Sequence, residues 1–241
     1  MLQGLEDRSV GAIITDPPFH VSVGRAANWM EKRGIGEDPW TSKTGDMTNQ
    51  DEIIEWTRPI VKETGRTIRL GGSLVIMGGT QSLLAWDLLT GRFGFQWMAE
   101  LVVLWNTGKP RARNFGGLHT RIVWYVRSGL RHAWNHPLRS VYSNVLVCSK
   151  VSQSDRVHPT QKPVGLTNFL VSLLSTEEDL IVDPFCGSGS TLVSAEQCGR
   201  PWIGCDLDER YVKIARQRAM MAEHEEVEPI YLWINGRLEE I

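Results

Sequence analysis

The sequence predicts an α/β protein with a Rossmann-like, mostly parallel sheet. Short apolar runs of strand length alternate with amphipathic stretches of helix length along the chain. Two of these runs end in an acidic residue followed by proline, at Asp16 and Asp183, as strands do at the functional edge of such sheets. The length of 241 residues, with 41% hydrophobic and 22% charged residues, suits one well-buried domain.

Hydrophobic periodicity and capping residues indicate the individual elements. Strands are expected at Val10–Thr15, Ser73–Met77, Ala99–Trp105, Arg121–Arg127, Leu180–Asp183, Trp202–Asp206 and Ile230–Ile234, and a short one is suggested at Val145–Cys148. Helices are expected at Asp51–Arg66, Gln81–Thr90, Val164–Leu174, Ser190–Cys198 and Asp208–Ala222. Asp51 and Asp208 stand where N-caps belong, and Pro59 should kink or shorten the first helix.

Two segments, residues 20–49 and residues 128–157, show neither the helical nor the strand pattern of apolar residues. Long loops inside a compact domain are usually functional or disordered. We therefore expect a single domain over residues 1–241 that carries both segments near its substrate.

Basic residues are concentrated in one part of the chain. From Leu101 to Ser154 there is no Asp or Glu, whereas this stretch holds eight of the 26 Lys and Arg residues. The other 18 basic residues stand against all 28 acidic residues. A basic segment in an otherwise acidic protein indicates a surface that faces a polyanion such as nucleic acid.

Composition also excludes several classes of protein. The four cysteines lack the paired short spacing of a zinc site or a disulfide framework, so we expect free thiols, no metal and a reducing compartment. No apolar run approaches the ~18 residues of a membrane span, and the N-terminus lacks a secretory pattern. These features predict a cytoplasmic protein without a membrane partner.

A nucleoside site is indicated between Leu180 and Thr191, where a strand, a Gly-rich turn and a helix start follow one another. Glycine lets a ligand approach the backbone, and a helix N-terminus offers unpaired N–H donors. Asp206 ends the next strand, where a carboxylate suits the two hydroxyls of a ribose. The turn alone would be structural by default, and Leu192 stands where a dinucleotide site needs a third glycine, which counts against NAD.

A second strand end carries Asp16-Pro17-Pro18-Phe19, which could be no more than a turn. Its chemistry nevertheless suits the exocyclic amino group of a base. A carboxylate and a backbone carbonyl held rigid by prolines can accept both N–H bonds and stabilise the positive charge that develops on nitrogen. The Phe19 ring offers a face on which the base can stack.

The chain resembles the amino (N6-adenine and N4-cytosine) DNA methyltransferases in their beta-group motif order. Asp16 to Phe19 looks like that family's catalytic tetrapeptide, and Asp183 to Thr191 looks like its cofactor loop. His158-Pro159-Thr160-Gln161-Lys162-Pro163 resembles the motif that closes over the methionine part of the cofactor. Gly204-Cys205-Asp206, followed by Tyr211, Ala215 and Arg218, is similar to its second strand and helix.

This resemblance implies a circularly permuted, seven-stranded sheet with an antiparallel hairpin over Trp105 to Arg127. The permutation further implies that Ile230–Ile234 supplies a strand beside the Asp206 strand and that the two chain ends meet on the surface. Thr120 departs from the family, which commonly has Glu there.

The resemblance also implies site residues and a cofactor, S-adenosyl-L-methionine. The catalytic residues would be Asp16, Pro17, Pro18 and Phe19, and His158 would position other groups without acting as a base. The cofactor would be held by Asp183, Phe185, Gly187, Gly189, Thr191, Asp206, Thr160 and Lys162. DNA would contact Lys109, Arg111, Arg113, Arg121, Arg131 and Arg139, and the insert 128–157 would be a short target-recognition region.

The expected activity is methylation of an exocyclic amino group in DNA, on a flipped-out base or on a single strand. Asp as first residue of the tetrapeptide favours adenine N6, with cytosine N4 as the alternative. RNA or protein amide acceptors share this chemistry, and a non-catalytic nucleic-acid-binding scaffold is a further alternative. A bacterial or phage source fits the resemblance, and a homodimer is left open.

Overall fold

A computed structural model describes residues 1–18, 49–105, 118–135, 143–225, 227–234 and 237–240 of the chain. Its strands are β1 (Val10–Thr15), β2 (Ile68–Gly78), β3 (Phe95–Trp105), β4 (His119–Arg127), β5 (Val145–Cys148), β6 (Ile181–Asp183), β7 (Trp202–Gly204), β8 (Ile230–Ile234) and β9 (Arg237–Glu240). Its helices are α3 (Gln50–Thr67), α4 (Thr80–Thr90), α5 (Val164–Leu174), α6 (Ser190–Gln197) and α7 (Glu209–Met220), with 3₁₀ turns at Leu2–Gly4 (η1), Gly91–Phe93 (η2) and Ala222–His224 (η3).

The strands form one sheet in the order β7-β6-β1-β2-β4-β3-β5-β8-β9. Parallel pairs join β7 to β6, β6 to β1, β1 to β2 and β3 to β5. Antiparallel pairs flank β4 and β8, so only these two of the described strands run against the rest. The predicted α/β class and the antiparallel β3–β4 hairpin are therefore confirmed.

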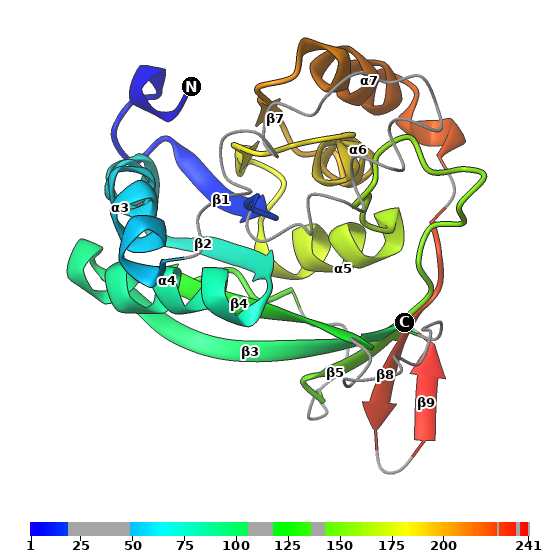
Figure 1. The fold of residues 1–241 in the computed structure, drawn as a ribbon, viewed down its shortest axis with the longest axis horizontal. Coiled ribbons are helices and arrows are strands. Elements are labelled where there is room, and N and C mark those ends of the chain that lie inside the picture. Colours follow the sequence, from blue (N-terminus) through cyan, green and yellow to red (C-terminus); the bar gives the residue numbers. More distant parts are fainter. Residues whose placement is uncertain (19–48, 106–117, 136–142, 226, 235–236, 241) are drawn as a thin grey trace.

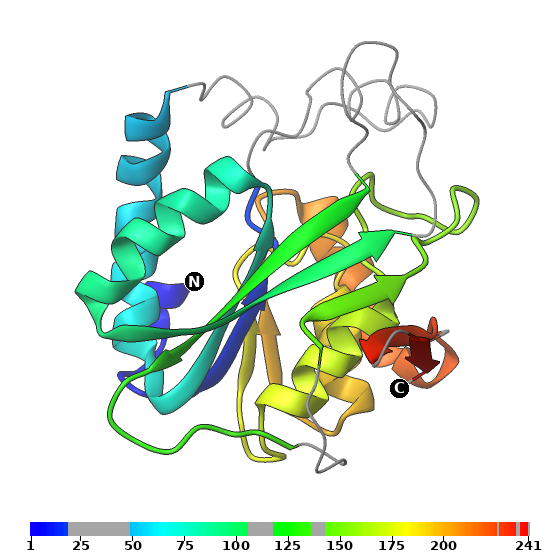
Figure 2. The ribbon, with the colours of Figure 1, turned by 90° about the horizontal axis from the view of Figure 1, so that it is seen from below.

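Helices cover both faces of the sheet (Figures 1 and 2). On one face, Val61 of α3 and Trp86 of α4 are buried against Ile13 of β1. On the other face, Leu170 of α5 and Ala195 of α6 are buried with neighbouring β-strand residues. β1 is buried at all six positions, as expected for a strand that is covered by helices on both faces.

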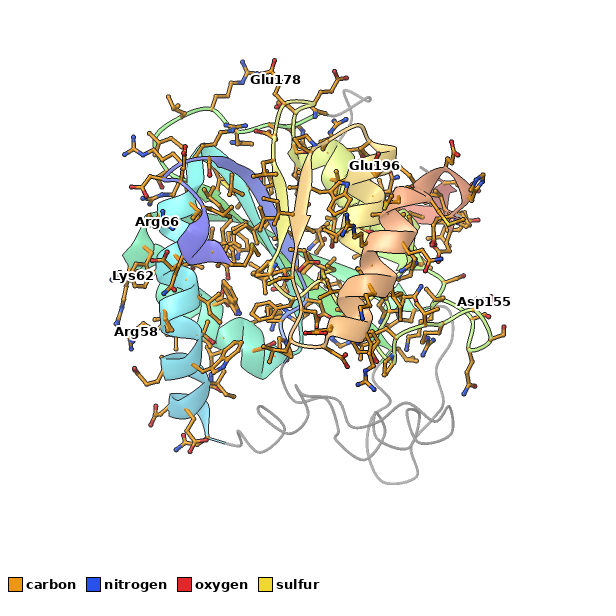
Figure 3. All side chains as sticks on the ribbon, turned by 90° about the horizontal axis from the view of Figure 1, so that it is seen from above. Arg58, Lys62, Arg66, Asp155, Glu178 and Glu196 are labelled. Carbon is orange, nitrogen blue, oxygen red and sulfur yellow. The ribbon has the colours of Figure 1, made fainter. Side chains whose placement is uncertain are left out.

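The carboxyl ends of β1, β6 and β7 lie at one edge of the sheet, because these strands are parallel and paired in register. Ile13 pairs with Val182, and Asp183 pairs with Gly204. This edge is where ligands bind in open α/β sheets. Glu178, at the amino end of β6, marks the opposite edge in Figure 3.

Two implications of the family resemblance are wrong. Over the described residues the sheet has nine strands, not seven, because β5 and β9 are added to the seven that were expected. The strand Ile230–Ile234 is not beside the Asp206 strand but pairs antiparallel with β5 at the other end of the sheet. As a result β9 lies far from η1, and the chain ends do not meet (Figure 1).

The physical reason lies in how the chain leaves α7. Gln197 Nε2 donates to the carbonyl oxygens of Ala222, at 2.8 Å, and Glu225, at 3.3 Å, and Gly165 N donates to the Glu228 carboxylate at 3.1 Å. These bonds hold residues 222–225 and 227–228 against α6 and the start of α5. Ile230 therefore arrives beside β5.

At α3 the predicted N-cap is wrong, and Pro59 does not shorten the helix. Asn49, not Asp51, is the N-cap, and its side chain accepts the Asp51 backbone N–H. The helix is 18 residues long in all and continues past Pro59. Ile53 and Val61 are buried on either side of Pro59, so packing holds the helix together despite the missing hydrogen bond. Asp208 is confirmed as the N-cap of α7.

None of the described helices combines the length and apolar composition that crossing a bilayer requires. The four cysteines are free thiols, of which Cys148 and Cys186 are buried. Across the described ranges, no group of three or more His, Cys, Asp or Glu residues is arranged to hold a metal ion.

Candidate active site

The predicted catalytic and cofactor motifs meet at the carboxyl edge of the sheet. Thr15 Oγ1, at the end of β1, donates to Asp183 Oδ1, at the end of β6, over 2.6 Å. The Phe185 backbone N–H donates to the same oxygen at 3.1 Å. In the other direction, Thr191 Oγ1 donates to the Ile14 carbonyl at 3.3 Å. The strand that leads into Asp16 is thus bonded directly to the cofactor loop.

Asp183 has unusual electrostatics for a surface-edge carboxyl group. Its side chain is fully buried, and desolvation raises its pKa to about 6, although the bonds from Thr15, Phe185 and Thr191 oppose this shift. The nearby Asp16 carboxylate raises the pKa further. Among the described residues no cation pairs with Asp183, and a buried carboxyl group of this kind is suited to receiving a cationic ligand group.

The turn after β6 depends on two glycines with left-handed backbone. Gly187 has φ +49° and Gly189 has φ +86°. At Gly189 an added Cβ would lie 2.7 Å from Ala215 Cβ, so the loop packs directly onto α7. The Gly187 N–H donates to Asp206 Oδ2 at 3.0 Å, which joins the loop to the segment after β7. The sequence analysis placed these two residues in the same nucleoside site.

Asp16 forms a salt bridge with Lys162, from the segment before α5. The Asp16 side chain is 28% exposed and that of Lys162 is 16% exposed, so a substrate can still reach the carboxylate. Ser190 Oγ donates to the Lys162 carbonyl at 2.7 Å and ties this segment to the start of α6. Lys162 was expected at the cofactor, and in the structure its side chain pairs with Asp16, the carboxylate predicted to be catalytic.

His158 packs edge-on against the buried Tyr211 ring, with the centroids 4.3 Å apart. The Thr160 N–H donates to its Nδ1 at 3.2 Å. Burial and the Lys162 charge lower the pKa of His158 to about 3, with a smaller opposing effect of Asp208. An imidazole of so low a pKa is a weak base, which agrees with the positioning role predicted for His158.

The predicted DNA contacts are divided between the two edges of the sheet. Arg121, near the strand tips, forms a bidentate salt bridge with Glu100 across the β3–β4 hairpin. Arg131 follows the end of β4, at the edge away from Asp16, where its backbone packs on Gly71. Phe19, Lys109, Arg111, Arg113 and Arg139 lie outside the described residues.

Several residues at this edge were missed by the sequence prediction. Thr15 donates to Asp183, and Trp56 of α3 lies 5.8 Å from the Phe185 ring. No local pattern identifies either one, because both contacts join segments far apart in the chain. Thr120, the departure from the family's Glu, accepts a hydrogen bond from Trp105 Nε1 at 3.0 Å.

The observed residues fit a nucleoside ligand that carries a positive charge. Two carboxyl groups, Asp183 and Asp206, stand at adjacent strand tips on either side of a turn that has no side chain at 187 or 189. The Phe185 ring beside them is half-buried and offers an apolar contact. The fold is that of Rossmann-like proteins, and this edge is a candidate site for a nucleoside ligand, with the end of β1 beside it.

The chain belongs to the DNA methylase family, whose model matches residues 10–217. Methylases of this family take their methyl group from S-adenosylmethionine. The type II methyltransferase M2.DpnII of Streptococcus pneumoniae is 27% identical over 241 residues, which cover 93% of this chain and 87% of that protein. M.HpaI of Haemophilus parainfluenzae is 25% identical over 239 residues, with coverages of 90% and 70%.

Solved structures agree in fold. M1.HpyAVI in complex with SAM matches with a TM-score of 0.67 and 22% identity, over 90% of each chain. The PvuII DNA methyltransferase, described as cytosine-N4-specific, matches with a TM-score of 0.70 and 17% identity, over 93% of this chain and 83% of that one.

Proposed function

We propose that this protein methylates the exocyclic amino group of a DNA base with S-adenosylmethionine as donor. The preferred target is adenine N6, and cytosine N4 is the alternative. The single observation that supports this methyl transfer most strongly is the hydrogen bond between Thr15 and Asp183. It joins the acceptor strand tip to the cofactor strand tip, so the two reactants would meet at one place.

At the acceptor, Asp16 would hold the target amino group. Its salt bridge with Lys162 uses Oδ2, and a carboxylate has a second oxygen that can accept an N–H bond. The Pro17 carbonyl would accept the other N–H, and Phe19 would stack on the base. Together they would turn the nitrogen lone pair toward the donor and stabilise the positive charge that grows on it.

S-adenosylmethionine, when bound, supplies a methyl group activated by its sulfonium. Asp183 would face the positively charged part of that ligand, Asp206 would take the ribose hydroxyls, and the turn at Gly187 and Gly189 would allow close approach. Thr191, Phe185 and Thr160 would complete the site. The salt bridge of Lys162 favours a role for it at Asp16 as well as at the cofactor.

The transfer balances without an external base. The bound cofactor would supply the methyl group and keep the sulfur electron pair, and Asp16 or water would accept the proton that the methylated nitrogen gives up. His158 is not required, since its pKa of about 3 makes it a poor proton acceptor.

A base stacked in a duplex cannot reach Asp16, so the target would be flipped out or single-stranded. Labelled S-adenosylmethionine and mixed-sequence DNA, followed by digestion to nucleosides, test the proposal. N6-methyladenine is expected, and N4-methylcytosine alone would move the target to cytosine. RNA offered in competition tests the other acceptor. Absence of any labelled base, with the cofactor bound in calorimetry, would favour the scaffold alternative.

A further inference from the structure

Three basic side chains lie in the segment between β5 and α5, and one of them, Lys162, forms a salt bridge with Asp16. Lys150 follows β5, whose last residue pairs with Trp105 at the carboxyl end of β3. Its Nζ lies 5.4 Å from the centroid of the Trp105 ring. Arg156 Nη2 donates to the Val151 carbonyl at 2.7 Å, which places its guanidinium next to Lys150.

Arg156 also reaches the segment that carries Lys162. Its Nη1 donates to the Pro159 carbonyl at 3.4 Å, and Lys162 lies three residues further on, paired with Asp16. Arg156 thus bridges the two ends of the segment between Lys150 and Lys162. The three cations form one cluster at the strand-tip edge.

The two neighbouring cations disfavour the charge on Lys150. Burial lowers the pKa of Lys150, and the charges of Arg156 and Lys162 lower it further. Asp155, the acidic residue within this segment, binds Ser152 Oγ at 2.6 Å and lies at the periphery of the molecule (Figure 3). Within the ranges that the structure describes, no carboxylate forms a salt bridge with Lys150.

Such an arrangement is suited to an anion. Like charges held together raise the free energy of the protein until an anion binds among them. The Trp105 ring supports the Lys150 side chain, and its own Nε1 is fixed by Thr120, so little ordering is needed when a ligand binds. A DNA backbone that delivers a base to Asp16 must pass close to this position.

We propose that Lys150 and Arg156 bind a backbone phosphate next to the nucleotide whose amino group reaches Asp16. This site rests on the proposed function and extends it, because the sequence indicated only that the insert 128–157 faces DNA and named neither Lys150 nor Arg156 as a contact. The other anion that could occupy the cluster is the carboxylate of the cofactor. The experiment below separates the two.

The test is DNA affinity as a function of salt, measured by fluorescence anisotropy with a mixed-sequence duplex and with one of its strands. For Lys150→Met we expect roughly fivefold weaker binding and a salt slope smaller by about 0.9 for the duplex. Lys150→Arg should restore both. Lys213→Met, which removes an exposed charge from α7, is the matched control and should leave both unchanged.

Calorimetry with S-adenosylhomocysteine completes the test. Unchanged cofactor affinity in Lys150→Met is expected. A wild-type salt slope in Lys150→Met would overturn the phosphate site, as would loss of cofactor affinity with DNA binding intact. If the unaltered protein bound no DNA, the proposed function itself would fail, and this site with it.

Discussion

At the scale of single residues, the site contains a buried carboxyl group, Asp183, whose burial lowers the stability of the folded protein. Asp183 is fully buried, and its bonds to Thr15 and Phe185 do not offset the loss of hydration. A cationic ligand would supply the missing charge. The same residue would therefore reduce stability and strengthen cofactor binding.

This gives a prediction for Asp183→Asn. Burial raises the pKa of Asp183 from its ordinary value of 3.8 to about 6, so its ionisation weakens folding above pH 6 and not below pH 4. The variant should be more stable than the wild type by about 3 kcal/mol at pH 8. This advantage should shrink as the pH falls from 6 to 4, while cofactor affinity is lost.

Urea unfolding at several pH values, with calorimetry for the cofactor, measures both effects. A stability difference that is the same at pH 4 and pH 8 would show that desolvation of Asp183 is not its cause. Cofactor binding as tight as in the wild type would remove Asp183 from the site.

At the scale of elements, the sequence predicted most of the helices and strands within a few residues. β1 and α5 have the predicted bounds, because buried apolar runs and flanking turn residues are local signals. The position of Asp16 and Asp183 at one edge of the sheet was also predictable, because the carboxyl ends of parallel strands lie at the same edge.

Pairing at the far end of the sheet was not predictable in this way. β8 is an apolar strand that could pair at either end of the sheet, and its partner β5 is chosen by the bonds that guide residues 222–225 and 227–228 past α6 and α5. For the same reason Lys162 was assigned to the cofactor: nothing in its own segment indicates that Asp16, 146 positions away, is its partner. Contacts that depend on the assembled sheet have no local signature.

The turn between β6 and α6 provides a prediction at this scale. An alanine in left-handed backbone costs roughly 1–2 kcal/mol. Gly189→Ala should lower the free energy of unfolding by more than this amount. Its Cβ would also meet Ala215 Cβ at 2.7 Å, which pushes the loop off α7. Cofactor affinity should fall at least about tenfold, since one lost contact of 1.4 kcal/mol is enough for that.

Gly199→Ala is the matched control. Gly199 also has positive φ, at +70°, but an added Cβ there has no atom within 4 Å. It should show the backbone cost alone and normal cofactor binding in thermal unfolding and calorimetry. Equal effects of the two substitutions would mean that packing of the loop on α7 does not matter.

At the scale of the whole molecule, one edge of the sheet carries the proposed chemistry. The strands that run parallel to β1 bring Asp16, Asp183 and Asp206 to this edge, while β4 carries Arg127 to the opposite one. The cations Lys150, Arg156 and Lys162 lie beside the acidic tips. The methyl donor would therefore bind at the acidic strand tips, and the DNA acceptor would contact the basic residues beside them.

The most direct test of this account is the methyl-transfer rate of Asp16→Ala, measured with labelled S-adenosylmethionine on the DNA that the wild type modifies. Transfer should fall about a hundredfold or more, the loss expected when a group that stabilises transition-state charge is removed. Thermal unfolding and cofactor affinity should stay close to wild type. A rate near that of the wild type would show that Asp16 does not hold the acceptor amine.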